Sequence, residues 1–199
     1  LGIRWTASAW DEKSQEFLRE YNTAFNKIAS PMLTHKNLLE MVAEEGKHTF
    51  ISTGMSNYRD IDRAVIIFDK HNCPITLFHC VSKYPAADDD CNIGMIQTLK
   101  RRYDCPIGYS GHEVGPLPSV IAVSLGAVAV ERHVTLDRSM YGSDQSASLE
   151  KKGLQLLVRD TRRVAEILGT GTKGLLQEEI ECANKLRYFS RDDFNWNDM

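Results

Sequence analysis

Short apolar runs alternate with amphipathic segments along most of the chain. Runs rich in apolar and β-branched residues predict strands at 3–9, 25–29, 49–52, 75–81, 107–110 and 128–134. Apolar residues at helical spacing, with capping residues at several of the ends, predict helices at 12–21, 34–45, 56–72, 92–103, 116–126 and 148–168. Thr34 is the predicted cap of the second of these helices. The run at 75–81 is apolar at nearly every position, as expected for a strand whose two faces are both buried in a parallel sheet.

Six strand–helix units without an antiparallel hairpin predict a parallel α/β fold. Two architectures fit: an open doubly wound sheet and a TIM-type (β/α)8 barrel. We favour the barrel because no Gly-rich dinucleotide fingerprint follows a strand, and because polar residues recur at the C-terminal end of every strand. An open sheet would concentrate them at one switch point. A barrel needs eight units, so either two units are missing at the N-terminus or the sheet is open.

Composition narrows the class of protein. The chain has 199 residues, of which 42% are hydrophobic, enough for a sizeable core. A net charge of −3 argues against a nucleic-acid or membrane surface, and no apolar run approaches the ~20 residues of a membrane-spanning helix. Five scattered cysteines without a CxxC pair favour free thiols in a reducing cytoplasm over a zinc site or disulfides. We therefore expect a cytoplasmic protein with a catalytic domain at 1–169 and a polar linker at 170–199; Leu1 in place of Met indicates a fragment.

Two histidines and a lysine are the strongest candidates for chemistry. His112 and His133 lie 21 residues apart at the ends of neighbouring parallel strands, so their imidazoles should converge on one metal ion or one anion, unless they are ordinary rim residues. Lys27, at another strand end, is a candidate phosphate or carboxylate contact, with a surface lysine as the alternative. Glu131 shares a strand face with His133 and needs a cation, for which Lys27 is the expected partner.

The remaining polar residues carry weaker signals. Serines recur at the strand ends, where hydroxyls can hold a phosphate, although each alone is equally typical of a helix cap or turn: Ser30, Ser52, Ser82 and Ser110. His79 ends an apolar strand and is at least as typical of a structural histidine as of a catalytic one. We assign no role to His35, His48 or His71, and expect a solvated loop at 88–90.

Six ordered motifs reveal a family resemblance. The runs are KIAS (27–30), STGM (52–55), HCVSKYP (79–85), GYSGH (108–112), ERHVTLD (131–137) and GSDQSASLE (142–150). Together, over about 2–181, the chain resembles the sialic acid synthase (N-acetylneuraminate synthase) family. The resemblance implies a TIM barrel followed by an antifreeze-like domain. It also implies condensation of phosphoenolpyruvate with an N-acylmannosamine or related amino sugar, a divalent metal (Mn²⁺ or Mg²⁺), and a homodimer in the complete protein.

The resemblance also implies roles for individual residues. His112 and His133 match metal ligands, and Asp144 matches an aspartate near the sugar. Lys27, Ser30, Ser52, Ser82 and Ser110 match the phosphoenolpyruvate pocket. Three positions depart from the family: Ser82, where Asn is frequent, Met32, where an acid contacts the sugar, and Gly111, where Asp is frequent. The chain then corresponds to strands three to eight plus part of the linker, without the first two units and the antifreeze-like domain.

Two rival functions remain open. A Schiff-base aldolase of the same fold would use Lys27 as its nucleophile. A non-catalytic, truncated barrel would bind a sugar or a partner chain through its exposed sheet edges. Borohydride trapping with pyruvate distinguishes the aldolase from the synthase, and sedimentation with a metal titration distinguishes the non-catalytic protein from the synthase.

Overall fold

The computed structural model describes residues 2–187. The chain divides into two units, Leu1–Ile167 and Leu168–Met199. The first unit contains one five-stranded sheet of order β1-β2-β3-β4-β5. Every strand pair in it is parallel. The strands are β1 (Asn26–Ile28), β2 (Thr49–Ser52), β3 (Ile75–Cys80), β4 (Ile107–Gly111) and β5 (Val130–Arg132).

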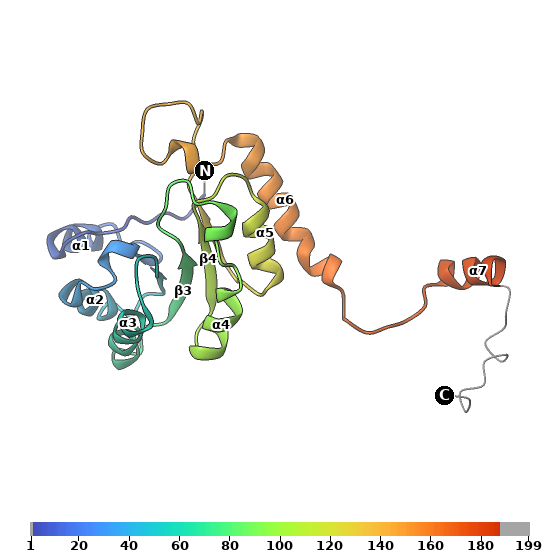
Figure 1. The fold of residues 1–199 in the computed structure, drawn as a ribbon. Helices are drawn as coiled ribbons and strands as arrows, with labels where there is room; N and C mark the ends of the chain where they lie inside the picture. Colours follow the sequence, from blue (N-terminus) through green and yellow to red (C-terminus); the bar gives the residue numbers. More distant parts are fainter. Residues whose placement is uncertain (1, 188–199) are drawn as a thin grey trace. The chain divides into compact units, whose positions relative to one another are not determined.

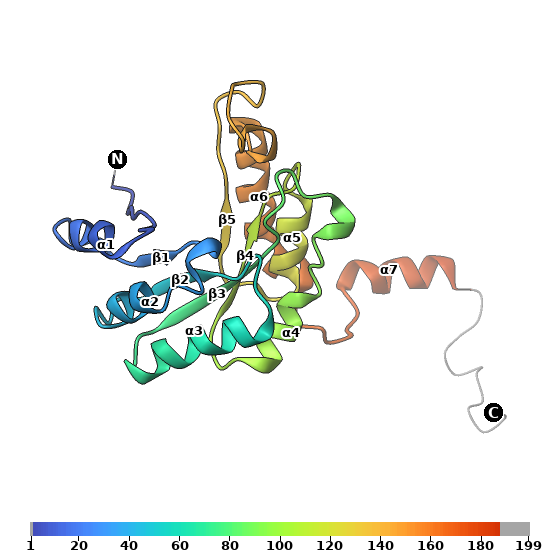
Figure 2. The ribbon, with the colours of Figure 1, turned by 60° about the vertical axis from the view of Figure 1, so that its left-hand side comes forward.

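Helices connect the strands and pack along the sheet (Figure 1). They are α1 (Glu12–Arg19), α2 (Lys36–Ala43), α3 (Tyr58–Lys70), α4 (Met95–Arg102), α5 (Leu117–Ser124) and α6 (Lys151–Leu168), with short 3-10 turns η1 (Ser30–Met32), η2 (Asp88–Asp90) and η3 (Gln145–Ala147). Figure 2 shows α3, α4 and α5 following the curve of the sheet from strand to strand. Within the described residues, no helix combines the length and apolarity needed to cross a membrane.

Strand order decides between the two predicted architectures. Each strand lies beside the next strand in the sequence, so the order never reverses and the sheet has no switch point. The sheet also curls. The side chain of Lys27 on β1 reaches that of Glu131 on β5, although three strands lie between them, and a flat sheet would keep the two apart. A parallel sheet that winds in one direction and curls is part of a TIM-type barrel, which confirms the predicted fold class.

The core follows from the apolar pattern. All six residues of β3 are buried, as the continuous apolar run predicts. On the helix side, Phe68 of α3 and Leu38 of α2 are fully buried. On the inner side, the rings of Phe25, Phe50 and Phe78 form a series with centroids 5.3 and 5.5 Å apart. These rings line the inner side of the curled sheet.

Two predictions about elements are wrong. Residues 3–9 form no strand: only Ser8 makes an isolated bridge, to Lys27, so five strands replace the predicted six. The cap of α2 is His35 rather than Thr34, since His35 Nδ1 accepts a hydrogen bond from the Leu38 amide. The tail, predicted as a polar linker at 170–199, contains the helix α7 (Gln177–Leu186) in the second unit; the part of that prediction at 188–199 lies outside the described residues.

Candidate functional site

A cavity of about 1240 Å³ lies at the C-terminal ends of the strands. All five strands or the loops that follow them contribute to its wall, as in the active sites of barrels. Every residue predicted from the sequence as a site residue lines it: Lys27, Ser30, Ser52, Ser82, Ser110, His112, His133 and Asp144. The structure therefore brings these eight residues together in one place, while their roles remain predictions.

Lys27 is a buried cation with an ion-pair partner across the sheet. Its Nζ donates hydrogen bonds to the Ile28 carbonyl oxygen at 3.0 Å and to Ser52 Oγ. Glu131 Oε2 lies 3.6 Å from Nζ, which confirms the predicted Lys27–Glu131 pair. Burial lowers the pKa of Lys27, while the Glu131 carboxylate opposes that shift. The side chain of Lys27 is 11% exposed, so this charge is held in a largely desolvated position facing the cavity.

The serine hydroxyls form two groups along the cavity wall. Ser110 Oγ donates to Glu131 Oε1 at 2.8 Å and so belongs with Ser52 to the Lys27–Glu131 cluster. Ser30 Oγ accepts a hydrogen bond from the Gly54 amide at 3.1 Å. Hydroxyls and an ammonium group on one wall are suited to binding an anion with several oxygen atoms.

The two candidate metal-binding histidines lie side by side. The ring centroids of His112 and His133 are 5.3 Å apart, so the two strand ends bring these rings together, and their convergence on one ion stays a prediction. His112 Nδ1 donates to the Val81 carbonyl oxygen at 2.7 Å, which leaves the lone pair of Nε2 free. Burial lowers the pKa of His112, favouring the neutral imidazole that binds metals. His133 Nδ1 lies 3.6 Å from Asp144 Oδ2.

These residues fit a divalent metal in the kind of donors they offer. A backbone carbonyl on one ring nitrogen is the usual way of orienting a metal-binding histidine. The part of the chain that the structure describes holds no group of three or more His, Cys, Asp or Glu residues placed to bind a metal. His112 and His133 would therefore supply two ligands, and water or substrate oxygen would complete the coordination.

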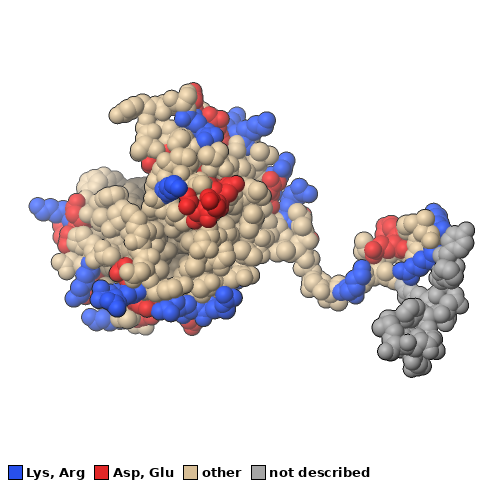
Figure 3. All heavy atoms as spheres, viewed as in Figure 1, with Lys and Arg blue, Asp and Glu red and all other residues tan. Residues whose placement is uncertain are grey.

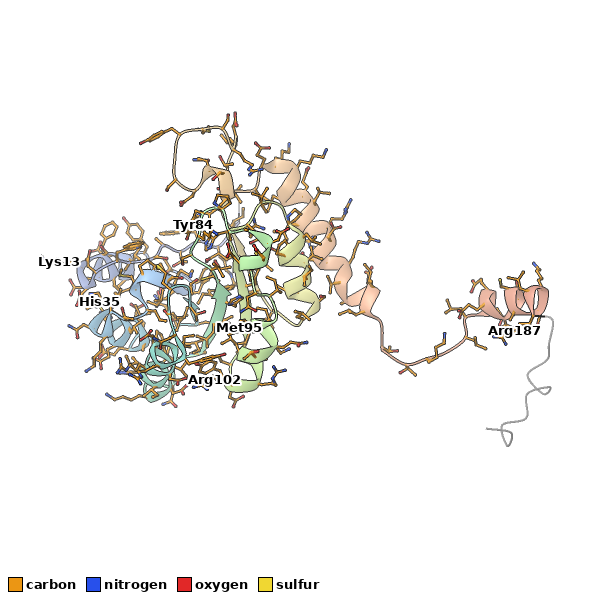
Figure 4. The ribbon with its side chains drawn as sticks, in the orientation of Figure 1. Lys13, His35, Tyr84, Met95, Arg102 and Arg187 are labelled. Atoms are coloured by element: carbon orange, nitrogen blue, oxygen red, sulfur yellow. The ribbon has the colours of Figure 1, made fainter. Side chains whose placement is uncertain are left out.

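Tyr84 was missed by the sequence reasoning. Its ring centroid lies 4.2 Å from that of His112 and 5.7 Å from that of His133, and it lines the cavity. Figure 4 shows Tyr84 at the end of the sheet toward which β3 points, at the opposite end from Arg102. The signal was its place in the HCVSKYP run, after a buried strand, where a rim aromatic can cover the site.

The other histidines have structural contacts. His79 Nε2 donates to the Cys91 carbonyl oxygen at 2.9 Å, and burial lowers the pKa of this histidine. His35 caps α2, and His48 Nε2 lies 2.9 Å from Thr76 Oγ1. The structural interpretation of His79 therefore agrees with its contacts, since its ring nitrogen is committed to the backbone.

Three further predictions concern residues beside the cavity. Met32, which stands where the family often has an acid, packs against the hydrophobic core and does not line the cavity. Gly111 leaves no room for a side chain, because an added Cβ would lie 2.6 Å from Glu113 Oε2. The acidic loop at Asp88–Asp90 is a 3-10 turn in which Asp90 pairs with Lys83.

Figure 3 shows basic and acidic side chains interspersed over the visible face of the first unit.

Known proteins resemble the chain over most of its length. Residues 1–173 match the NeuB family. The N-acetylneuraminate-9-phosphate synthase of Mus musculus is 42% identical over 187 residues, covering 94% of this chain and 52% of that protein. The N,N'-diacetyllegionaminic acid synthase of Campylobacter jejuni is 34% identical over 188 residues, covering 93% of this chain and 56% of that protein.

A solved structure gives the same picture. The N-acetylneuraminic acid synthetase of Leptospira borgpetersenii, crystallised in complex with citrate, matches with a TM-score of 0.83 and 40% identity, covering 94% of this chain and 67% of that chain. The chain spans about half the length of the curated relatives described above.

Proposed function

Because the chain belongs to the NeuB family, we propose that it carries most of the active site of a synthase that joins phosphoenolpyruvate to an N-acylated amino sugar. The products are a sialic acid, or a related nonulosonic acid, and phosphate. One observation carries the proposal: the adjacent imidazoles of His112 and His133, a buried lysine and a wall of hydroxyls face one cavity at the strand ends. Such a site can hold an anionic substrate beside an electrophile.

Lys27 and the serines are the proposed phosphoenolpyruvate subsite. The ammonium group is desolvated, so its attraction for a phosphate or carboxylate is much stronger than in water. Its contacts with the Ile28 carbonyl and Ser52 fix it before the substrate arrives. Fixed donors stabilise charge without reorganising during the reaction, and they orient the substrate for attack.

His112 and His133 are the proposed ligands of a divalent metal, Mn²⁺ or Mg²⁺. Bound there, the metal would polarise the aldehyde oxygen of the open-chain sugar. His112 serves this purpose because Val81 fixes its tautomer and burial keeps the ring neutral. Asp144, beside His133, is the proposed contact for the sugar.

The chemistry balances without a further reactant except water. The methylene carbon of phosphoenolpyruvate forms a bond to the aldehyde carbon, and the aldehyde oxygen gains a proton. Water adds to the resulting cationic C2 and releases a proton. The C2–O bond to phosphate then breaks, the new C2 hydroxyl loses its proton and becomes the keto oxygen, and inorganic phosphate leaves. The residues of the chain hold the phosphate, the carboxylate and the sugar in line during these steps.

The sugar is the open part of the proposal. The relatives named above make products of different kinds, an N-acetylneuraminate 9-phosphate and an N,N'-diacetyllegionaminic acid. Three carbons come from phosphoenolpyruvate, so a phosphate on C9 of the product corresponds to C6 of the sugar. N-acetylmannosamine, its 6-phosphate and a diacetylated analogue are therefore the substrates to compare.

Product analysis tests the proposal. The protein that contains this chain is incubated with phosphoenolpyruvate, Mn²⁺ and each sugar, and phosphate and the nine-carbon acid are measured together. We expect equal amounts of both products with one sugar, loss of both with a chelator, and loss of both in His112→Ala. His71→Ala, at the end of α3, is the matched control and should retain activity. Product formation by His112→Ala at the wild-type rate would reject the proposal.

A further inference from the structure

A buried ion pair lies directly behind the two histidines of the proposed metal site. Glu113 follows His112 in the sequence, and Arg132 precedes His133. Arg132 Nη1 lies 2.8 Å from Glu113 Oε1, and the two side chains are 2% and 0% exposed. Ser119 of α5 contacts the pair, so the pair lies between the sheet and its helices. Each charged residue is therefore one peptide bond away from an imidazole that faces the cavity.

The Arg132 guanidinium links three segments of the chain. Nη1 donates to the Gly115 carbonyl oxygen at 2.7 Å and to Ser119 Oγ at 3.1 Å, at the start of α5. Nη2 donates to the Glu113 carbonyl oxygen and, at 3.5 Å, to that of Ala147 in η3. One side chain thus connects the segment after His112, the strand before His133 and the turn that follows Asp144.

The Glu113 carboxylate is also held from its other side. Tyr109 Oη donates to Glu113 Oε2 at 2.8 Å. Gly111 packs so closely that a Cβ there would lie 2.6 and 2.8 Å from the two carboxylate oxygens. The carboxylate therefore has one position, and that position sets the course of the chain immediately after His112.

Resting on the function proposed above, we infer that Glu113 and Arg132 are positioning residues that fix the separation of His112 and His133 and so set the affinity of the metal site. Stability alone is a poor explanation for this pair, because desolvating two charges costs about as much as their attraction returns. Residues that orient metal ligands typically change metal affinity by about 10- to 100-fold when they are lost. Arg132 can position both ligands because it belongs to β5, next to His133, and binds Glu113, next to His112.

The test uses Arg132→Lys in the full chain, titrated with Co²⁺ and followed by visible absorption. Lysine keeps a positive charge near Glu113, but it lacks the planar fork that reaches Gly115 and Ala147 together. We expect Co²⁺ to bind about 10- to 100-fold more weakly, with a changed absorption spectrum because the two rings no longer hold their spacing. The matched control is Arg102→Lys, which alters a surface ion pair with Asp62 on the outer helices and should leave both readouts unchanged.

A second variant keeps the inference falsifiable if Arg132→Lys folds poorly. Glu113→Gln combined with Arg132→Met leaves no buried charge, so the thermal midpoint should stay close to wild type while Co²⁺ affinity falls by a similar factor. Wild-type affinity and spectrum in both variants would overturn the positioning role and leave the proposed function standing. Failure of the unmutated chain to bind Co²⁺ would instead overturn the proposed metal site, and this inference with it.

Discussion

Replacing Lys27 by methionine should separate fold stability from substrate binding. The side chain keeps its length, but the buried charge disappears. We expect the free energy of unfolding to stay unchanged or to rise by about 1 kcal/mol, because the cost of desolvating the ammonium group is no longer incurred. Glu131→Gln is the opposite change, because it leaves Lys27 charged, buried and unpaired. It should lower the free energy of unfolding by about 1–2 kcal/mol.

The magnitude follows from the geometry of the pair. At 3.6 Å, the attraction between unit charges is about 1 kcal/mol in water-like surroundings and about 5 kcal/mol at an effective dielectric constant of about 20. The side chain of Glu131 is 41% exposed, so the lower part of this range applies. Losing that attraction in Lys27→Met is offset by the several kcal/mol of desolvation that a buried ammonium costs. The asymmetry between the two variants is therefore the quantity to measure.

Urea unfolding at pH 7 gives the stabilities, and calorimetry gives the affinity for phosphoenolpyruvate. A charged hydrogen bond contributes about 1.5–3 kcal/mol, so Lys27→Met should bind phosphoenolpyruvate about 10- to 150-fold more weakly. The penalty in Glu131→Gln should also shrink as the pH rises. Burial lowers the pKa of Lys27, so the unfolded chain binds more protons than the folded chain near pH 10. Equal destabilisation by both variants, with unchanged phosphoenolpyruvate affinity in Lys27→Met, would show that Lys27 neither carries a desolvation cost nor binds the substrate.

Three other predictions concern the same unit. Gly111→Ala should cost about 1–3 kcal/mol in urea unfolding, because the added Cβ meets the fixed Glu113 carboxylate, whereas Gly174→Ala, with open space around it, should cost under about 0.5 kcal/mol; equal costs would contradict the packing. Borohydride with pyruvate should leave Lys27 unmodified by mass spectrometry, and a stable adduct would favour the aldolase rival. Burial lowers the pKa of His112, so the unfolded chain protonates first as the pH falls below about 6.5, and the free energy of unfolding declines. His112→Gln should remove part of that decline between pH 7 and 5. An unchanged decline would show that His112 does not contribute to it.

The sequence predicted strands well where burial and propensity agree. β2 matches its predicted residues, and β3 differs from its prediction by one residue. Most side chains of β2 and all side chains of β3 are buried, in agreement with their apolar character. The run at 3–9 also contains apolar and β-branched residues, but its first side chains are poorly covered: Ile3 is 77% exposed and Trp5 is 53% exposed. A strand pattern without a buried partner is therefore not sufficient to predict a strand. The α2 cap was misplaced by one residue, since a histidine side chain can accept the same amide bond as a threonine.

The candidate site was predictable to the extent that it follows from topology. The ends of parallel strands meet at one edge, so His112, His133 and Lys27 could be placed there from their positions alone. The Glu131–Lys27 pair followed from the need of a carboxylate inside a barrel for a cation. Tyr84 and Arg132 could not be placed in this way. The direction of a loop aromatic, and the partners of a residue on the outer strand face, depend on packing between distant segments.

The amount of Mn²⁺ bound by the protein at equilibrium, determined by electron paramagnetic resonance of the free ion, tests the proposed metal site directly. The two imidazole centroids lie 5.3 Å apart at the cavity, and one ring nitrogen of His112 is already fixed by the backbone, so we expect one bound Mn²⁺ per chain. The variant His112→Ala with His133→Ala should bind none at the same concentration. Equal binding of Mn²⁺ by that double variant and the unmutated protein would show that His112 and His133 are not the metal ligands.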